Sequence, residues 1–545
     1  MGRRIRWLGL VLVLCFAAVL AQLVNVQLRQ ASALDAASTN PRNASRHLDN
    51  FRGTILTSDG TVLARSVPVP NHKPTQYEYA RTYPGGFLYS GMVGYDSLLY
   101  GTAGVENVYN TQLSLHPAKA RTLSQVLSPP PPTTDDVTLT VTPSVQLAAY
   151  RALASNPDTF RDGAVVALNP KTGAVLAMYS SPSYDPNALS SLDAGTEKLG
   201  RLADLTKDAE GFAPLNPMAT FSRFLPGSTY KVVTSGAVYN LRPTLSNFHW
   251  GPGKCTKPGT IPGTINTVCN DGTTKTASAC GGTMLQMLPQ SCDPGYVMLG
   301  LAVGSTAMYR QSNLFGVNSK APIDLTTVSP SHFPAPATFV TGSKGPGRAG
   351  LAYAAFGQGT VSVTPLQNAM VAAAVAETGR IMAPHVLSQI RDAQGALVEK
   401  YKPTVYKQAL SPAAAHKVSV LMQLVTTTPS GTAYGVFPAQ DQVAAKTGTA
   451  QVKTAFTRTD DWMIGFAPAS DPIVAVAVGV PYQPKTGYGA TVAGPIMEKV
   501  ISAALAAAAR RGTLPTTTTT APLPTTTTST SSTTTTTVPA TTTTV

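Results

Sequence analysis

The chain has 545 residues, 43% of them apolar and 12% charged, and its formal net charge is +14. This length is sufficient for two or three folded units with sizeable cores. The lysines and arginines are scattered and form no basic stripe interleaved with aromatic residues, which argues against a nucleic-acid partner. A basic protein close to an anionic membrane or a polyanionic polymer accounts better for the charge.

The first segment is an apolar run that follows a basic stub. Three arginines lie within residues 1–6, and an apolar stretch with two polar interruptions occupies residues 7–26. About twenty apolar residues can span a bilayer, and preceding arginines stay on the cytoplasmic side. The sequence predicts a cytoplasmic stub (1–6) and a single transmembrane signal anchor (7–26) in the plasma membrane, with the remaining chain outside the cytoplasm. The alternative is a signal peptide cleaved near Val19–Ala21, but the apolar run continues past that point.

Two other segments have the composition of a linker and a tail. Four prolines at 129–132 are followed by Thr-Thr-Asp-Asp, which predicts a semi-rigid linker. This linker ends a polar region, 27–136, whose turn formers suggest a small mixed α/β module. The last thirty residues contain nineteen threonines. Because such a segment has nothing to bury, residues 513–545 are predicted to be disordered.

Strands and helices alternate beyond the linker. The expected elements are a strand at 137–141, a helix at 144–154, a hairpin at 163–178 with its turn at 169–173, helical segments within 228–310 and at 364–377, adjacent antiparallel strands at 461–468 and 473–480, and a terminal helix at 492–511. Helices packed on an antiparallel sheet are the natural arrangement of these elements. The sequence therefore predicts an α+β fold for residues 137–512.

Four cysteines are clustered in the part of the chain predicted to be exported, where disulfides are permitted. They are Cys255, Cys269, Cys280 and Cys292. Their spacings lack the C-x-x-C pairs of a zinc site, so two disulfides are expected. Three pairings are possible, of which Cys255–Cys269 with Cys280–Cys292 is preferred. The seven histidines are grouped neither with one another nor with acids, so no metal and no cofactor is expected.

The sequence Phe-Leu-Pro-Gly-Ser-Thr-Tyr-Lys at 224–231 has the spacing of a nucleophile and its base. Ser228 and Lys231 lie one turn apart on the same face if the segment is helical. A lysine held neutral by burial or by neighbouring cations can take the serine proton. The preceding Pro226-Gly227 turn would put the serine at a helix N-terminus, whose amide groups face a developing oxyanion. A lone pair at this spacing is more often a solvated helix face.

Two later motifs follow Ser228 in the chain. Ser291-Cys-Asp293 begins 63 residues after it, and Lys446-Thr-Gly-Thr449 follows a short apolar run. Lys-Thr-Gly also occurs at 171–173 in the predicted hairpin turn and at 485–487 in a loop with two prolines, where turn chemistry explains it. Lys446 alone follows Ser291 and stands on a predicted strand, so this copy is interpreted as functional.

This order of motifs is the signature of penicillin-binding proteins and class A β-lactamases. The chain further resembles class B penicillin-binding proteins, including elongation-type members from actinobacteria. The segments that carry this likeness are Phe356–Gly359, Val363–Gln367, Arg52–Gly60, Gly104–Glu106 and Asn40–Asn43. The resemblance covers residues 1–511. It implies a serine β-lactamase/transpeptidase-like domain at 137–512 on a pedestal or dimerisation-like domain at 27–136.

The resemblance implies acyl transfer on peptidoglycan stem peptides that end in D-Ala-D-Ala, which cross-links the cell wall. Ser228 would attack the penultimate carbonyl and expel D-alanine. Lys231 would be the base, Ser291 would relay the proton to the leaving amine, and Lys446 would supply positive potential.

The substrate-binding side of the site is implied in the same way. The hydroxyl groups of Thr447 and Thr449, with Gly448 between them, would hold the carboxylate that β-lactam antibiotics mimic. The backbone amides of Ser228 and Thr449 would form the oxyanion hole. A membrane lipid-II polymerase of the SEDS glycosyltransferase type is the expected partner.

Asp293 departs from the family pattern, which has asparagine at this position. An ionised carboxylate can only accept hydrogen bonds, so a donor to the substrate would be lost, and its charge would favour protonated Lys231. Asp293 could also be protonated, pair with Lys446, or only cap a helix before Pro294. Two other functions therefore stay open. One is an impaired homologue that acts as a scaffold or β-lactam sensor, and the other is a D,D-carboxypeptidase or β-lactamase, against which the pedestal argues.

Overall fold

The computed structural model describes residues 2–26, 50–70, 77–97, 100–118, 131–154, 162–190, 212–257, 260, 261, 264, 267–270, 276–340, 347–452, 458–484 and 487–512. The predicted tail, the segment 40–43 and the first two prolines of the predicted linker lie outside these residues. At the N-terminus, α1 (Gly2–Val24) is a single helix. Its residues 7–24 have a mean hydropathy of 2.5 and are not buried, as expected of a candidate anchor.

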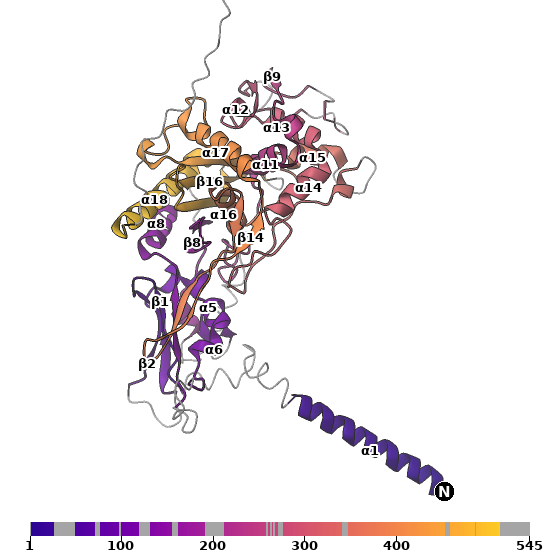
Figure 1. Cartoon of the computed structure of the whole chain (residues 1–545), viewed down its shortest axis with the longest axis vertical. Coiled ribbons are helices and arrows are strands. Elements are labelled where there is room, and N and C mark those ends of the chain that lie inside the picture. The colour runs from indigo at the N-terminus through magenta and orange to yellow at the C-terminus, as the bar shows by residue number, and fades with distance from the viewer. Residues whose placement is uncertain are drawn as a thin grey trace, which may run out of the picture.

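A six-stranded sheet forms the pedestal, in the order β13-β12-β6-β1-β2-β3 (Figure 1). Its strands in chain order are β1 (Ile55–Thr57), β2 (Val62–Pro68), β3 (Tyr79–Thr82), β6 (Asp135–Leu139), β12 (Leu387–Asp392) and β13 (Leu397–Lys400). The strand predicted at 137–141 is thus present as β6. It pairs in parallel with β1 and antiparallel with β12. The division at residue 137 stays a prediction, and the sheet crosses it.

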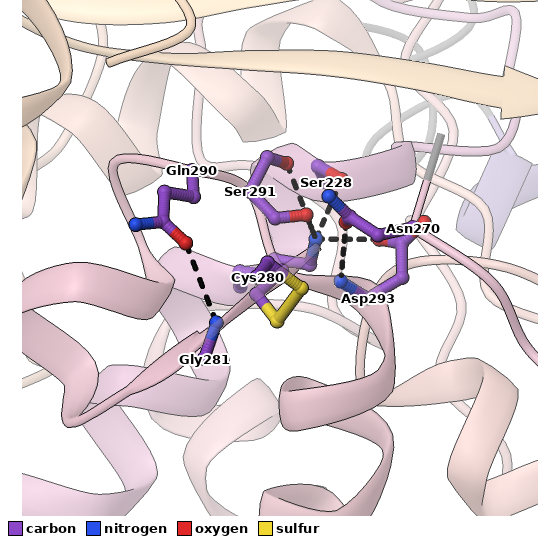
Figure 2. Close-up of a disulfide and its surroundings, with 9 residues drawn as sticks. Ser228, Asn270, Cys280, Gly281, Gln290, Ser291 and Asp293 are labelled. Atoms are coloured by element: carbon purple, nitrogen blue, oxygen red, sulfur yellow. Dashed lines mark hydrogen bonds and ion pairs between the residues drawn. A yellow bond between two sulfur atoms is a disulfide. The ribbon is translucent and has the colours of Figure 1, made fainter. Parts of the chain in front are cut away.

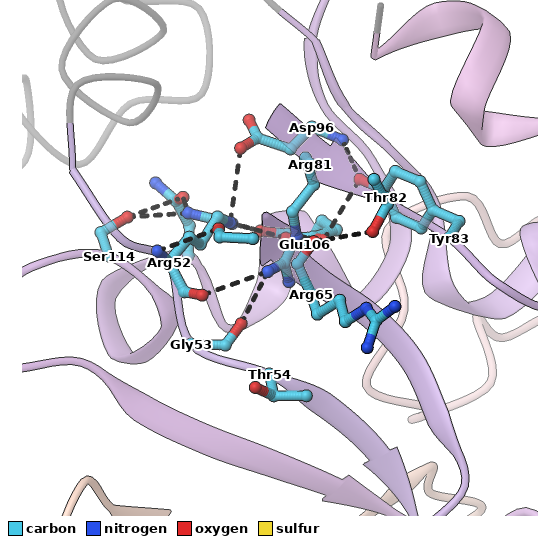
Figure 3. Close-up of polar contacts among 12 residues, drawn as sticks. Arg52, Gly53, Thr54, Arg65, Arg81, Thr82, Tyr83, Asp96, Glu106 and Ser114 are labelled. Carbon is cyan, nitrogen blue, oxygen red and sulfur yellow. Dashed lines mark hydrogen bonds and ion pairs between the residues drawn. The ribbon is translucent and has the colours of Figure 1, made fainter. Parts of the chain in front are cut away.

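The pedestal core contains a cluster of buried ionic side chains next to this sheet (Figure 3). Glu106 accepts a hydrogen bond from Nε of Arg52 and another from Nε of Arg81, each at 2.7 Å. Asp96 lies 3.4 Å from Arg52, and the Tyr83 hydroxyl donates to Glu106. All these side chains are buried. The two motifs that carried the pedestal resemblance, around Arg52 and Glu106, therefore meet in one ion-paired centre.

Short elements complete the pedestal and its junction with the rest of the chain. They are η2 (Gly86–Leu88), α4 (Ser90–Val93), β4 (Asp96–Ser97), β5 (Gly101–Thr102), α5 (Gly104–Val108), α6 (Asn110–Leu113) and α9 (Pro186–Leu189). Two further strands, β11 (Arg380–Met382) and β14 (Val405–Gln408), pair with each other.

A five-stranded antiparallel sheet is the centre of the second region, in the order β15-β16-β17-β7-β8. Its strands in chain order are β7 (Gly163–Leu168), β8 (Val175–Ser181), β15 (Ala444–Gln451), β16 (Arg458–Ala467) and β17 (Val474–Pro484). The strands are buried along almost their whole length, because helices cover both faces. Helices α8 (Pro143–Ala154) and α18 (Gly489–Arg510) pack together on the sheet, and α16 (Pro365–Ala376) packs on β7, β16 and β17. The predicted α+β class is confirmed.

Helix α18 is also long and apolar enough to cross a membrane, but half of it is buried in the fold. Its contacts with α8 and with the strands of the central sheet are those of a core helix. The sequence-predicted helix at 492–511 is therefore confirmed as part of the folded domain.

A helical region lies beside the β15 edge of this sheet. It consists of η3 (Gly227–Tyr230), α11 (Lys231–Leu241), η4 (Pro243–Leu245), α13 (Asp293–Val303), α14 (Ser305–Leu314), η5 (Pro336–Phe339), α15 (Gly347–Ala354), α17 (Pro412–Thr427) and η6 (Ala439–Asp441). An insertion between η4 and α13 contains β9 (Trp250–Gly253), β10 (Cys280–Gly282) and α12 (Met284–Met287). Two disulfides, Cys255–Cys269 and Cys280–Cys292, close it, which confirms the preferred pairing.

Candidate active site

The turn that holds Ser228 is fixed against two neighbouring segments. Ser228 lies in η3, which continues directly into α11, so the predicted helix start is present. Gly227 has φ = +53°, and its amide donates to the Gly357 carbonyl at 3.0 Å. A Cβ at Gly227 would lie 2.9 Å from the backbone of Thr449. Only glycine tolerates both this conformation and this approach, so the Ser228 turn packs directly on the Lys446–Thr449 strand.

Lys231 is the centre of a polar network that joins Ser228, Ser291 and Asp293, the three residues labelled around it in Figure 2. Its Nζ donates to Ser228 Oγ at 3.0 Å, to the Ser291 carbonyl at 2.6 Å and to Asp293 Oδ1 at 2.6 Å. The side chain is fully buried. The predicted three-residue spacing therefore brings a nucleophile and an amine into hydrogen-bond contact away from bulk water.

Ser291 joins the two lysines of the site. Its hydroxyl accepts from Lys446 Nζ at 3.0 Å and lies 3.2 Å from Lys231 Nζ. The residue has φ = +54°, a left-handed conformation that costs a non-glycine residue about 1–3 kcal/mol. In this conformation the Ser291 carbonyl is directed at Lys231, and the Ser291 hydroxyl lies between the amines of Lys231 and Lys446. The arrangement suits transfer of a proton through Ser291.

Asp293 lies at the start of α13 but does not cap it. Cys292 is the N-cap residue and makes no side-chain capping bond, so the capping interpretation of Asp293 is wrong. Pairing with Lys446 is also wrong, because the Asp293 carboxylate binds Lys231. The backbone amide of Asp293 donates to the side-chain oxygen of Asn270 at 3.0 Å, a residue that sequence reasoning did not single out.

Burial dominates the ionisation of both lysines. It lowers the pKa of Lys231 below its ordinary value, although the Asp293 carboxylate and its hydrogen bond act in the opposite direction. Burial and the neighbouring Lys231 lower the pKa of Lys446 much further. Desolvation, which disfavours the charged amine, therefore has a larger effect on the Lys231 pKa than the Asp293 carboxylate has.

The Lys446–Thr449 segment runs along β15, the edge strand predicted from its apolar neighbours. Lys446 is fully buried, and the Thr447 hydroxyl lies 2.7 Å from that of Thr432. Thr449 Oγ1 accepts from the Gly489 amide at 3.0 Å. A Cβ at Gly448 would lie 2.7 Å from the Pro226 carbonyl, so the third residue of the motif must be small.

The other two Lys-Thr-Gly copies differ from this one. Lys171 lies in the hairpin turn between β7 and β8, where it is exposed and paired with Asp471. Lys485 and Thr486 lie outside the described residues. Within the described part of the chain, no group of three or more His, Cys, Asp or Glu side chains is placed to hold a metal ion.

Two known protein families match parts of this chain. The family described as penicillin binding protein transpeptidase domain matches residues 163–502, more than half of the chain. The chain belongs to the penicillin-binding protein transpeptidase family. This penicillin-binding protein also matches the penicillin binding protein A dimerisation domain over residues 52–128, where the pedestal was predicted.

Relatives along the whole length support a class B, PbpA-like protein. The penicillin-binding protein is 32% identical over 499 residues to the peptidoglycan D,D-transpeptidase PbpA of Mycolicibacterium smegmatis, covering 89% of this chain and 95% of that protein. The ceftriaxone acyl-enzyme of penicillin-binding protein A from M. tuberculosis has a TM-score of 0.72 at 28% identity, covering 85% of this chain and all of that one. The D,D-transpeptidase domain of a peptidoglycan glycosyltransferase from Eggerthella lenta has a TM-score of 0.68 at 28% identity, covering 86% of this chain and all of that one.

Proposed function

We propose that this penicillin-binding protein is a serine-type peptidoglycan D,D-transpeptidase that cross-links stem peptides through an acyl-enzyme on Ser228. The observation that carries the proposal is the 3.0 Å contact between Lys231 Nζ and Ser228 Oγ in a buried network that continues through Ser291 to Lys446. An acyl-transfer enzyme needs such an activated serine, and the acyl-enzyme complexes of a structural relative agree with it.

In the acylation step, neutral Lys231 takes the Ser228 proton as Oγ attacks the penultimate carbonyl of a D-Ala-D-Ala peptide. The peptide bond breaks, and the proton passes through the Ser291 hydroxyl to the departing D-alanine amine. The amides of Ser228 and Thr449 are proposed to hold the oxyanion. Their proximity is supported by the 3.0 Å separation between a Cβ at Gly227 and Thr449 N. An amine from a second stem peptide then resolves the ester.

The substrate carboxylate is proposed to bind along β15. Thr447 and Thr449 flank Gly448 on this strand. The Lys446 amine donates to the Thr447 carbonyl and lies 3.3 Å from the Thr447 hydroxyl oxygen. Hydroxyl donors next to a buried cation favour an anion. A β-lactam carboxylate offers the same group.

The cellular setting is proposed from the N-terminal helix. We expect α1 to be a single-pass plasma-membrane anchor that holds the catalytic domain outside the cytoplasm. From the family resemblance, the expected partner is a membrane lipid-II polymerase, which would supply the uncross-linked glycan strands.

The other functions considered have less support. The scaffold or sensor hypothesis depended on Asp293, yet the network around Ser228 is complete with the aspartate in place. The carboxypeptidase hypothesis requires water as acceptor, whereas the two PbpA relatives that match about 90% of the chain are named D,D-transpeptidases.

A product assay separates these functions. Full-length protein in detergent would be incubated with a D-Ala-D-Ala stem-peptide donor and an amine acceptor, and the products analysed by mass spectrometry. We expect a donor–acceptor cross-link and free D-alanine. Hydrolysed donor without any cross-link would favour the carboxypeptidase, and folded protein that releases no D-alanine and binds no penicillin would contradict enzymatic function altogether.

Replacing Asp293 by asparagine is expected to speed acylation at low pH. The carboxylate raises the pKa of Lys231, so its removal lowers that pKa and increases the neutral fraction of the base at any given pH. The acid limb of the second-order rate of acylation against pH should therefore move to lower pH. Stopped-flow measurements with a chromogenic cephalosporin would give both profiles. A limb that moves to higher pH would show that the site depends on the carboxylate.

A further inference from the structure

We propose that Asn270 is a substrate-binding residue, whose side-chain amide donates a hydrogen bond to a backbone carbonyl of the acyl donor. This inference rests on the proposed transpeptidase function and names a residue outside its sequence motifs. In this proposal, Asn270 of the disulfide-closed insertion supplies the hydrogen-bond donor that an ionised Asp293 cannot provide.

Asn270 is held firmly beside the catalytic network. Its backbone amide donates to the Lys254 carbonyl at 2.8 Å, and its carbonyl accepts from the Ser278 amide at 3.2 Å. The residue is 6% exposed. It directly follows Cys269, whose disulfide to Cys255 closes this part of the insertion.

Each of the two disulfides restrains the chain next to one of these residues, Asn270 or Asp293. Cys269 immediately precedes Asn270, and Cys292 immediately precedes Asp293. The 3.0 Å hydrogen bond from the Asp293 amide to Asn270 Oδ1 then joins the two cross-linked segments. Asp293 in turn accepts a hydrogen bond from Lys231, the partner of Ser228. The insertion therefore fixes the position of the Asn270 side chain relative to the Ser228–Lys231 pair.

The hydrogen bond to Asp293 also fixes which way the Asn270 side chain is turned. A backbone N–H can only donate, so the atom that faces it must be the side-chain oxygen. The NH₂ group must then face away from the Asp293 amide, and Figure 2 shows the Asn270 side chain directed toward Ser228. Among the described residues, none accepts a hydrogen bond from this NH₂ group. An amide donor in this position favours a carbonyl partner.

Asp293 cannot fill this role while it is ionised. Its Oδ1 is occupied by Lys231, and a carboxylate has no proton to donate. When a peptide donor reaches Ser228, its backbone carbonyls enter the site beside Asn270. Each of these carbonyls then loses the hydrogen bonds that it made to water in solution. The Asn270 amide is a donor already in place for one of them.

The test uses two kinds of β-lactam on the full-length protein. Penicillin G carries an amide carbonyl on its side chain, as a peptide donor does, whereas a carbapenem with a hydroxyethyl group lacks it. Asn270→Asp keeps an oxygen for the Asp293 amide but removes the donor. We expect its acylation by penicillin G to slow about tenfold to a hundredfold relative to its acylation by the carbapenem.

A charge-balanced double variant, Asn270→Asp with Asp293→Asn, is the matched control. It restores one carboxamide and one carboxylate, so penicillin G acylation should recover relative to the single variant. Equal loss with both β-lactams, or no loss with either, would overturn the role of Asn270. If the wild-type protein is acylated by neither compound, the proposed transpeptidase function itself has failed.

Discussion

Replacing Ser228 by alanine is expected to abolish covalent labelling of the full-length protein by a fluorescent penicillin. The Ser228 hydroxyl is the group that Lys231 contacts at 3.0 Å within the network. The Ser291 hydroxyl also contacts Lys231, but it is held between the amines of Lys231 and Lys446. Labelling would be followed by gel fluorescence, and the modified peptide identified by mass spectrometry.

Ser235→Ala is the matched control for this experiment. Ser235 is a buried serine of α11, the helix that follows the Ser228 turn, but its hydroxyl bonds the Tyr296 hydroxyl at 2.7 Å instead of Lys231. Its variant should still be labelled. Both variants should melt cooperatively, which shows that they are folded. Residual labelling of Ser228→Ala at the wild-type rate would mean that another residue is the nucleophile.

Replacing Glu106 by glutamine is expected to have the largest effect on stability. Glu106 accepts hydrogen bonds from both Arg52 and Arg81 in a fully buried centre. The uncharged glutamine amide would leave Arg81 without a paired anion. Removing one partner of a buried ion pair costs about 3–5 kcal/mol. Urea denaturation of the detergent-solubilised protein, followed by circular dichroism, should show the midpoint at lower urea.

Asp471→Asn makes the same carboxylate-to-amide change in an exposed ion pair with Lys171. Exposed pairs contribute about 0–1 kcal/mol, so its midpoint should stay close to that of the wild type. Below its transition, Glu106→Gln should still be labelled by penicillin, because Glu106 contacts no residue of the Ser228 network. Equal midpoints for the two variants would contradict the stabilising role of the Arg52–Glu106–Arg81 cluster.

The parts of the site that depend on local spacing could be predicted from the sequence. Ser228 and Lys231 face each other because three residues make almost one helical turn. Lys446 could be placed on a strand from its apolar neighbours. In each case, residues close in the chain determine the geometry.

The contacts that join distant segments could not be predicted in this way. Strand β6 follows the linker directly, yet it pairs with the pedestal strand β1 and with β12 far along the chain. Arg81 has no sequence neighbour that marks it as a partner of Glu106. Asn270 resembles a turn residue of the insertion, and its place beside Asp293 follows from the fold of two disulfide-closed segments.

The position of β12 in the pedestal sheet also has a consequence for biosynthesis. A ribosome makes the chain from its N-terminus, so β1, β2, β3 and β6 emerge long before Leu387–Asp392. Until then, one side of β6 has its backbone hydrogen-bonding groups without their final strand. An open sheet edge of this kind is a template for aggregation. The pedestal, although first in the sequence, is therefore among the last parts that can finish folding.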